Sequence, residues 1–238
     1  MSKINRKKLI KQPDEFLTFS SKAIAWSKDN SKLLMGIACG LVFAVAVWVG
    51  LGTYLEYRQN QASDALAGSF ENYMKAVGGK ADPAQEKAAR ESLAKVVDQY
   101  GATPAGIQAR LALGNLLVEK AKYADAEKIL SELSEETDLP PGMLPLAWHG
   151  LGLSLEGQKK YKEAASAYES AMKEAGPTLR NSYRLDLARV QEAAGDKDAA
   201  IKTYSEAVAQ PPDPSSLDLV RSRLVVLDVD PAVLAKNK

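Results

Sequence analysis

The stretch WHGLGLSLEGQKKYKEAASAYESA, residues 148–171, decides the fold. Compact residues stand where two helices of a hairpin would cross closely, Gly152 in the first helix and Ala164 in the second. Large side chains at Trp148 and Tyr168 are suited to fill the space between neighbouring hairpins. The spacing of small and large residues therefore predicts a closely packed pair of helices.

The glycines at positions 150, 152 and 157 raise the alternative of a phosphate-binding loop. Such a loop needs glycines at a strand-to-helix turn, and nucleoside-triphosphate sites add a Lys-Ser or Lys-Thr pair. Here the sequence shows no strand pattern and no such pair. We therefore interpret the glycines as packing positions, with Gly157 ending or loosening the first helix and Lys159 and Lys160 in the turn.

The same pattern recurs in register along the chain. The small residue near the start of each second helix, Ala126, Ala164 or Ala200, follows its predecessor by 38 and then 36 residues. The pattern resembles the tetratricopeptide repeat, a helix pair of about 34 residues. Its matching positions are Leu113, Gly114, Leu117, Tyr123, Ala126, Leu130 and Leu133 in 107–140; Trp148, Leu151, Gly152, Leu155, Tyr161, Ala164, Tyr168 and Ala171 in 145–178; and Leu187, Ala188, Gly195, Ala200, Tyr204, Ala207 and Pro212 in 181–214.

Two departures from the signature stand out: Arg184 occupies the Trp position of the last unit, and Pro177 falls one place late. A fourth, degenerate pair is expected at about 60–100. A helix over 214–228 is expected to cover the last pair, because terminal repeats of an array are capped. The fold class is therefore all-α, with an N-terminal transmembrane helix and a tetratricopeptide-repeat α-solenoid of about four helix pairs plus a capping helix.

Local start signals agree with this division. A side chain able to cap a helix precedes Pro at the first helical position at Asp82, Thr103 and Asp213. Since Ala, Leu, Glu and Lys dominate between the Gly and Pro breaks, the whole of 56–238 is expected to be helical.

A membrane anchor is predicted at residues 33–55. LLMGIACGLVFAVAVWVGLGTYL carries no charge, and a helix of this length spans the roughly 30 Å core of a bilayer. A cleaved signal peptide is not expected, because 32 residues precede the segment. A lipoprotein site at Cys39 is not expected either, since Gly36 replaces an aliphatic residue and sixteen apolar or neutral residues still follow.

Charge predicts the orientation of this anchor. Residues 1–32 hold eight Lys or Arg against three acids, while the rest of the chain is slightly acidic. Because basic residues are retained on the cytoplasmic side, 1–32 is expected to be cytoplasmic and 56–238 extracytoplasmic. The extracytoplasmic part also lacks the basic surface that a nucleic-acid partner requires.

Two further features concern the membrane. Phe16, Phe19, Ile24 and Trp26 stand among lysines, a pattern that suits either a short amphipathic helix on the membrane face or a flexible tail. Within the span, small residues lie four apart, which favours close approach of a second membrane helix. These residues are Gly36, Gly40 and Ala44.

Catalytic and metal-binding signals are weak. The chain has one histidine and one cysteine, no H-E-x-x-H and no Gly-Lys-Ser/Thr motif. Its acidic clusters, such as 131–136, fall where solvated helix faces are expected. We therefore expect no enzymatic activity, no metal site and no cofactor.

A peptide-binding groove is expected on the first helices of the repeats. In such arrays the inner face is built from positions 2, 5, 9 and 12 of each first helix. Here these are Gln108, Leu111, Asn115, Val118, Leu146, His149, Leu153, Glu156, Ser182, Leu185, Arg189 and Glu192. The expected ligand is an apolar segment of another protein, contacted by the four leucines and oriented by Arg189 and Glu192.

The alternative to a ligand-binding groove is that the superhelical curl of the array, or its first helix pair, buries these leucines. A clamp for a terminal carboxylate is not expected, because Leu111 and His149 stand where a cation is needed and Asn115 alone does not form one.

The whole chain resembles the YfgM-type family of bacterial inner-membrane proteins. The resemblance rests on the basic leader, the span, the closing helix and the stretch L-x-x-V-V-x-x-Y-G-x-T-P-A-G-x-x-A-R-L-A-L-G at 93–114. It implies an ancillary subunit of the Sec translocon, with a periplasmic domain that meets emerging chains and connects them to periplasmic chaperones. The alternatives are a scaffold for envelope assembly that binds a folded partner complex, and an enzyme or ligand sensor.

Overall fold

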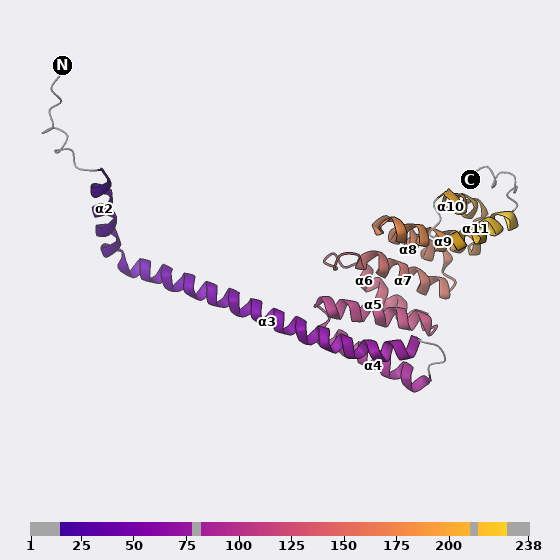
Figure 1. Cartoon of the computed structure of the whole chain (residues 1–238), viewed down its shortest axis with the longest axis horizontal. Helices are drawn as coiled ribbons and strands as arrows, with labels where there is room; N and C mark the ends of the chain where they lie inside the picture. The colour runs from indigo at the N-terminus through magenta and orange to yellow at the C-terminus, as the bar shows by residue number, and fades with distance from the viewer. Residues whose placement is uncertain (1–14, 78–81, 210–213, 228–238) are drawn as a thin grey trace, which may run out of the picture. The chain divides into compact units, whose positions relative to one another are not determined.

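The computed structural model describes residues 15–77, 82–209 and 214–227, which divide between two compact units, 1–57 and 58–238. The described residues are helical and contain no strand, which confirms the all-α prediction (Figure 1). The predicted cap at Asp213 and the termini lie outside these residues.

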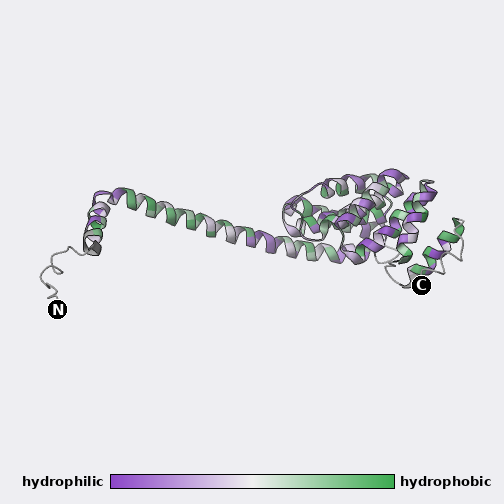
Figure 2. Cartoon of the chain, turned by 90° about the horizontal axis from the view of Figure 1, so that it is seen from above, coloured by the Kyte–Doolittle hydropathy of each residue, from purple (hydrophilic) through white to green (hydrophobic). Residues whose placement is uncertain are grey.

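The first unit consists of α2, Glu15–Asp29, and the first part of α3, Ser31–Val77. The apolar part of α3 is long and hydrophobic enough to cross a membrane, and its most apolar stretch is not buried by other described residues. Figure 2 shows this part as a nearly continuous run of hydrophobic residues. The predicted N-terminal apolar helix is therefore present.

Within its described residues, the second unit contains the remainder of α3 and eight further helices. Their bounds are α4 Pro83–Tyr100, α5 Pro104–Glu119, α6 Tyr123–Ser134, α7 Met143–Gly157, α8 Tyr161–Glu174, α9 Pro177–Ala193, α10 Lys197–Ala209 and α11 Pro214–Val226. From α4 onward, consecutive helices pack together, and α5 also contacts α7. This is the contact pattern of stacked helix hairpins, numbered here from first to fourth as α3–α4, α5–α6, α7–α8 and α9–α10, with α11 packed on the last of them.

Predicted caps start two of these helices. Asp82 Oδ1 accepts hydrogen bonds from the backbone N–H groups of Ala84 and Gln85 ahead of α4, and Thr103 Oγ1 accepts one from Gly106 ahead of α5. Each cap satisfies N–H groups that the first helical turn leaves without a partner. Two of the predicted start signals are thus confirmed.

The part of α3 from Arg58 onward is joined to its neighbours at three levels. Arg58 Nη2 donates to Gln99 O at 2.9 Å, and Ser69 Oγ donates to Ser92 O at 3.1 Å, both on α4. Near the end of α3, Lys120 Nζ donates to Ala76 O at 2.7 Å. These bonds fasten α3 both to its own partner helix and to the second hairpin.

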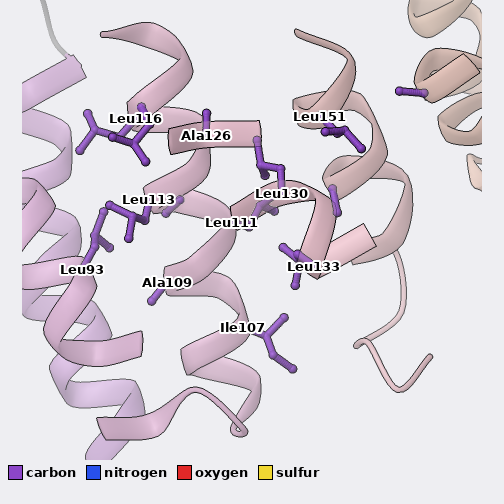
Figure 3. Close-up of a cluster of buried hydrophobic side chains, with 14 of the residues drawn as sticks. Leu93, Ile107, Ala109, Leu111, Leu113, Leu116, Ala126, Leu130, Leu133 and Leu151 are labelled. Atoms are coloured by element: carbon purple, nitrogen blue, oxygen red, sulfur yellow. The ribbon is translucent and has the colours of Figure 1, made fainter. Parts of the chain in front are cut away.

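One hydrophobic core runs through the hairpins. Leucines from α4, α5, α6 and α7 gather between the helices, and Leu93, Leu116, Leu130 and Leu133 are at most 1% exposed (Figure 3). A smaller cluster joins α9 and α10 to Val220 and Leu224 of α11. The last helix thus covers apolar surface that the array would otherwise expose.

Side-chain size sets how closely the two helices of each hairpin approach. An ideal Cβ on Gly152 would lie 2.5 Å from Cε1 of Tyr168, and one on Gly114 would lie 2.6 Å from Cδ2 of Leu130. Real Cβ atoms do not approach other atoms so closely, so these positions require glycine. The positions predicted from the repeat pattern that are buried are Leu113, Gly114, Leu117, Ala126, Leu130, Leu133, Leu151, Gly152, Leu155, Ala164, Tyr168, Ala171, Leu187, Ala188, Ala200, Tyr204 and Ala207.

Trp148 and Tyr161 are half-buried at the edges of this packing. Trp148 packs against two core clusters, the main one and a small one made by Ala171, Ala175 and Tyr183. It therefore contacts residues of both the third and the fourth hairpin, the place expected of a side chain that fills the space between pairs.

The turns that connect α5 to α6, α7 to α8 and α9 to α10 share one backbone geometry. Ala121, Lys159 and Gly195 occupy equivalent places and have φ values of 55°, 63° and 82°, in the left-handed region. After each one, the next residue's N–H bonds back to a carbonyl of the preceding helix, as Lys160 does to Leu155 O at 2.9 Å. Glycine adopts this conformation without strain, yet it is present in only the last of these three turns.

Gly157 therefore has a different role from a turn residue. It is the last residue of α7, as expected, but the left-handed residue of this turn is Lys159, two positions later. An ideal Cβ on Gly157 would lie 2.3 Å from Cε1 of Tyr123. Gly157 thus makes room for the ring that begins the second helix of the preceding hairpin.

Replacing Ala121 by Gly is expected to stabilise the array by about 1 kcal/mol, because it relieves the left-handed strain of an L-residue at the end of a helix. Chemical unfolding of the full chain in detergent, followed by circular dichroism, measures the change. As a control, Ala88→Gly in the exposed middle of α4 should destabilise by about 1 kcal/mol. Equal effects of the two changes would contradict the assignment of strain to this turn.

Replacing Gly152 by Ala is expected to destabilise the array by about 1–3 kcal/mol, since the new methyl group must displace the buried ring of Tyr168. The same unfolding measurement applies. Gly68 offers a matched control, because it lies in a helix with nothing within 4 Å of an added Cβ. Gly68→Ala should stabilise the array by about 1 kcal/mol. If Gly152→Ala stabilises it as well, the ring of Tyr168 does not require a glycine at position 152.

Candidate functional site

The predicted groove positions lie on one helix of each hairpin, α5, α7 and α9. We call them together the first-helix face. Gln108, Leu146 and Arg189 are exposed, and the following are half-buried: Asn115, Val118, His149, Leu153, Glu156, Ser182, Leu185 and Glu192. Most of the predicted face is thus available for contact.

Leu111 differs from the other positions. It is 8% exposed and belongs to the main core. The reason is that α5 packs against α4, α6 and α7 and is therefore covered on most sides. Leu111 offers almost no surface to a ligand, so its assignment as a groove contact was wrong.

Two hollows open along this face. The first, of about 360 Å³, has aromatic and aliphatic walls and is named here the tyrosine hollow. Its lining residues are Val118, Tyr123, Leu153, Glu156, Gly157, Tyr161, Arg189 and Ala193. The second, of about 370 Å³, is named the arginine hollow and is lined by Ser182, Leu185, Asp186, Arg189, Tyr204, Leu219, Val220 and Arg223.

Arg189 lines both hollows and forms ion pairs with two carboxylates. Its guanidinium is paired with Glu156 of α7 and with Asp186 on its own helix, where Nη2 lies 2.7 Å from Oδ1. Partial burial lowers the pKa of the Arg189 guanidinium below its usual value. Since both neighbours are acidic, Arg189 is already compensated and is poorly suited to bind a free carboxylate.

His149 joins the third hairpin to the fourth. Its Nε2 lies 3.0 Å from Asp186 Oδ2, and its ring stacks on Tyr183 with centroids 4.4 Å apart. The Tyr168 ring is also near, at 5.7 Å. The sequence analysis identified His149 as a groove position, and the structure adds that it bridges α7 and α9.

A repeated Tyr–Glu hydrogen bond lies beneath the face. Tyr168 Oη donates to Glu156 Oε2 at 2.8 Å, and Tyr204 Oη donates to Glu192 Oε2 at 3.1 Å. Each bond joins the two helices of one hairpin and leaves the second carboxylate oxygen for an arginine, Arg189 or Arg223. The glutamates thus position both the packing tyrosine and the surface cation.

Sequence reasoning missed this bond, although a signal was present. The tyrosine follows the glutamate by 12 residues in both hairpins, and the pair recurs after 36 residues. In the second hairpin the corresponding residues are Val118 and Leu130, which pack without a polar bond. Asp186 and Arg223 were likewise outside the predicted set because their roles depend on contacts between different helices.

The small residues of the apolar segment are exposed along α3. Gly36, Gly40 and Ala44 are four residues apart, so they lie on one side of the helix, and a Cβ added at either glycine would meet no atom from another part of the described structure within 4 Å. This side of α3 is therefore open to a second helix.

Comparison with known families identifies the repeats. A family described as tetratricopeptide repeat-like domain matches residues 25–141, and a tetratricopeptide repeat family matches 111–180 and 149–216. No curated protein matches the chain significantly. The predicted tetratricopeptide-repeat solenoid with a capping helix is thereby confirmed.

The described residues show no cluster of His, Cys, Asp and Glu able to hold a metal ion. Tetratricopeptide-repeat families are typically modules for protein interaction rather than enzymes. The first-helix face has aliphatic and aromatic walls around a charge-compensated centre.

The pH dependence of stability is expected to report the Tyr204–Glu192 bond. Burial, reinforced by the charge of Glu192, raises the pKa of Tyr204 to about 12, whereas an unfolded tyrosine ionises near pH 10. The stabilisation is therefore complete below about pH 10 and is lost as pH rises toward 12. In Tyr204→Phe the loss over this interval should be smaller by about 1 kcal/mol.

Unfolding by denaturant at a series of alkaline pH values measures this difference. Tyr57→Phe is the control, because Tyr57 is 63% exposed. It should retain the wild-type pH profile. A Tyr204→Phe profile that parallels the wild type would show that ionisation of Tyr204 does not contribute to the loss of stability at alkaline pH.

Proposed function

We propose, from the premise that this chain carries tetratricopeptide repeats behind an apolar N-terminal helix, that it is a membrane-tethered protein-interaction module. Its first-helix face binds extended or helical apolar segments of other proteins. No catalytic step is assigned to it.

The observation that carries this proposal is the pair of adjoining hollows on either side of Arg189. Leu153 lines one hollow and Leu185 the other, so two apolar side chains of a ligand can be accommodated in succession. The compensated charge of Arg189 makes an apolar segment a better ligand than an acidic one. Such shallow sites suit weak binding to varied sequences.

The apolar helix would allow weak binding to be sufficient. Tethering to a membrane complex raises the effective concentration to roughly millimolar, so tight binding is unnecessary. The family match from residue 25 onward includes this helix, which supports treating the anchor and the repeats as one functional unit. The side of α3 that carries the small residues Gly36, Gly40 and Ala44 is the proposed contact with a partner's membrane helix.

We place residues 1–32 in the cytoplasm, 33–55 in the bacterial inner membrane and 56–238 in the periplasm. The basic excess before the span supports this orientation. With the YfgM-type resemblance, the arrangement suggests a factor beside the Sec translocon that receives secreted chains or links them to periplasmic chaperones.

The second candidate function is a scaffold for envelope assembly that binds a folded partner by its ends. Exposed apolar side chains on the terminal helices favour it. Met74 on α3 is 60% exposed and Val226 on α11 is 67% exposed. Such side chains at both ends of an array suit contacts with a large surface.

Crosslinking in cells separates the two functions. Leu146→Glu and Leu153→Glu are each expected to reduce crosslinks from the first-helix face to partner chains by about tenfold, because a buried charge opposes apolar binding. Leu146 is exposed and makes the safer variant for folding, while Leu153 lines a hollow. Mass spectrometry of the crosslinked products gives the measurement.

Val226→Glu is the matched control on the closing helix. Under the groove proposal it leaves these crosslinks unchanged. If Val226→Glu abolishes the partners and the two leucine variants retain them, with helical content and unfolding unaltered, the scaffold replaces the groove as the function.

A further inference from the structure

We propose that α2 lies on the cytoplasmic surface of the bilayer beside the span, with one face in the headgroup region and lysines on anionic lipid headgroups. This inference rests on the membrane anchor of the proposed function. It assigns a lipid-binding role to a segment that the repeats do not require.

One side of α2 is apolar and uncovered. Phe19, Ala23 and Trp26 are separated by four and three residues and therefore lie on one side of the helix. Phe19 is 73% exposed and Trp26 56% exposed. With Ile24, which is 57% exposed and lies about 100° from Ala23, these exposed residues occupy one half of the helix circumference. Exposed aromatic rings of this kind are favoured at the interface between lipid and water.

Lysines border the apolar side on both edges. At about 100° per residue, Lys22 lies about 60° from Phe19 on one edge, and Lys28 about 40° from Ile24 on the other. Their long side chains can reach the headgroups while their stems stay in the apolar region. The excess of eight basic over three acidic residues in 1–32 adds attraction to an anionic surface.

The junction places α2 at the end of the span. Asn30 lies between the two helices, and both its backbone N–H and its Nδ2 donate to Trp26 O at 2.9 Å. Helix α3 begins at the next residue, Ser31, and its uncharged segment starts at Leu33. Only a few residues therefore separate α2 from the hydrocarbon region, so the nearest large apolar surface is the bilayer itself.

Two alanines provide the test. Ala23 lies on the apolar side, and Ala25, two residues later, lies about 200° away on the polar side. In a Cys39→Ala background, the full chain carrying Ala23→Cys or Ala25→Cys is purified and placed in nanodiscs of phosphatidylethanolamine and phosphatidylglycerol. A membrane-impermeant maleimide should label Ala25→Cys at least tenfold faster than Ala23→Cys.

Charge and lipid composition are varied next. In the double variant Lys22→Glu and Lys28→Glu, the labelling rates at positions 23 and 25 should approach each other, as they should in phosphatidylcholine nanodiscs. Equal rates at the two positions in the phosphatidylglycerol nanodiscs overturn the proposal. That result would mean that α2 is free in solution or needs a protein partner that the purified system lacks.

The native Cys39 tests the anchor separately. In the wild-type chain it lies within the apolar segment, so it should resist the same reagent until detergent is added. Protection of Cys39 together with equal labelling at 23 and 25 overturns only the role of α2. Rapid labelling of Cys39 in nanodiscs would overturn the membrane anchor, and both proposals with it.

Discussion

The structure depends on one contact repeated with variations, a large side chain of a second helix resting on a residue without a side chain in the first. In the third hairpin this is the ring of Tyr168 against Gly152, and in the second it is Leu130 against Gly114. The absent Cβ lets the two backbones approach closely. Stacking of such hairpins then produces the continuous core and the face that carries the hollows.

The same contact connects stability with binding. Tyr168 is fully buried, yet its hydroxyl reaches Glu156 on the first-helix face, where the carboxylate also pairs with Arg189. The residue that a ligand would meet is therefore held in place by the core. This preorganisation lowers the entropy cost of binding, because the side chains around the hollows are ordered before a ligand arrives.

Much of the fold could be predicted from the sequence because it depends on the spacing of residues close together in the chain. The small residues at 126, 164 and 200, the Pro-initiated helices and the uncharged span each depend on short-range rules. The prediction failed where several helices act on one residue. Leu111 has the spacing of a groove residue, but α4, α6 and α7 cover it, and no pattern within α5 reveals that.

The polar details show the same limit. The bond from His149 to Asp186 joins residues 37 positions apart on different helices, and its stacking on Tyr183 depends on how two hairpins meet. Likewise, the spacing predicted that Lys159 lies in the turn, but it did not predict that Lys159, and not a glycine, adopts the left-handed conformation there. Spacing identifies which residues share a face, but the partners across helices follow only from the packed structure.

The bonds from Arg58, Ser69 and Lys120 to neighbouring backbone lie at successive levels along α3. A force along the axis of this helix would load the three attachments in shear, so that they resist together instead of separating one after another. The overlap of α3 with its neighbours thus has the mechanical arrangement of a lap joint.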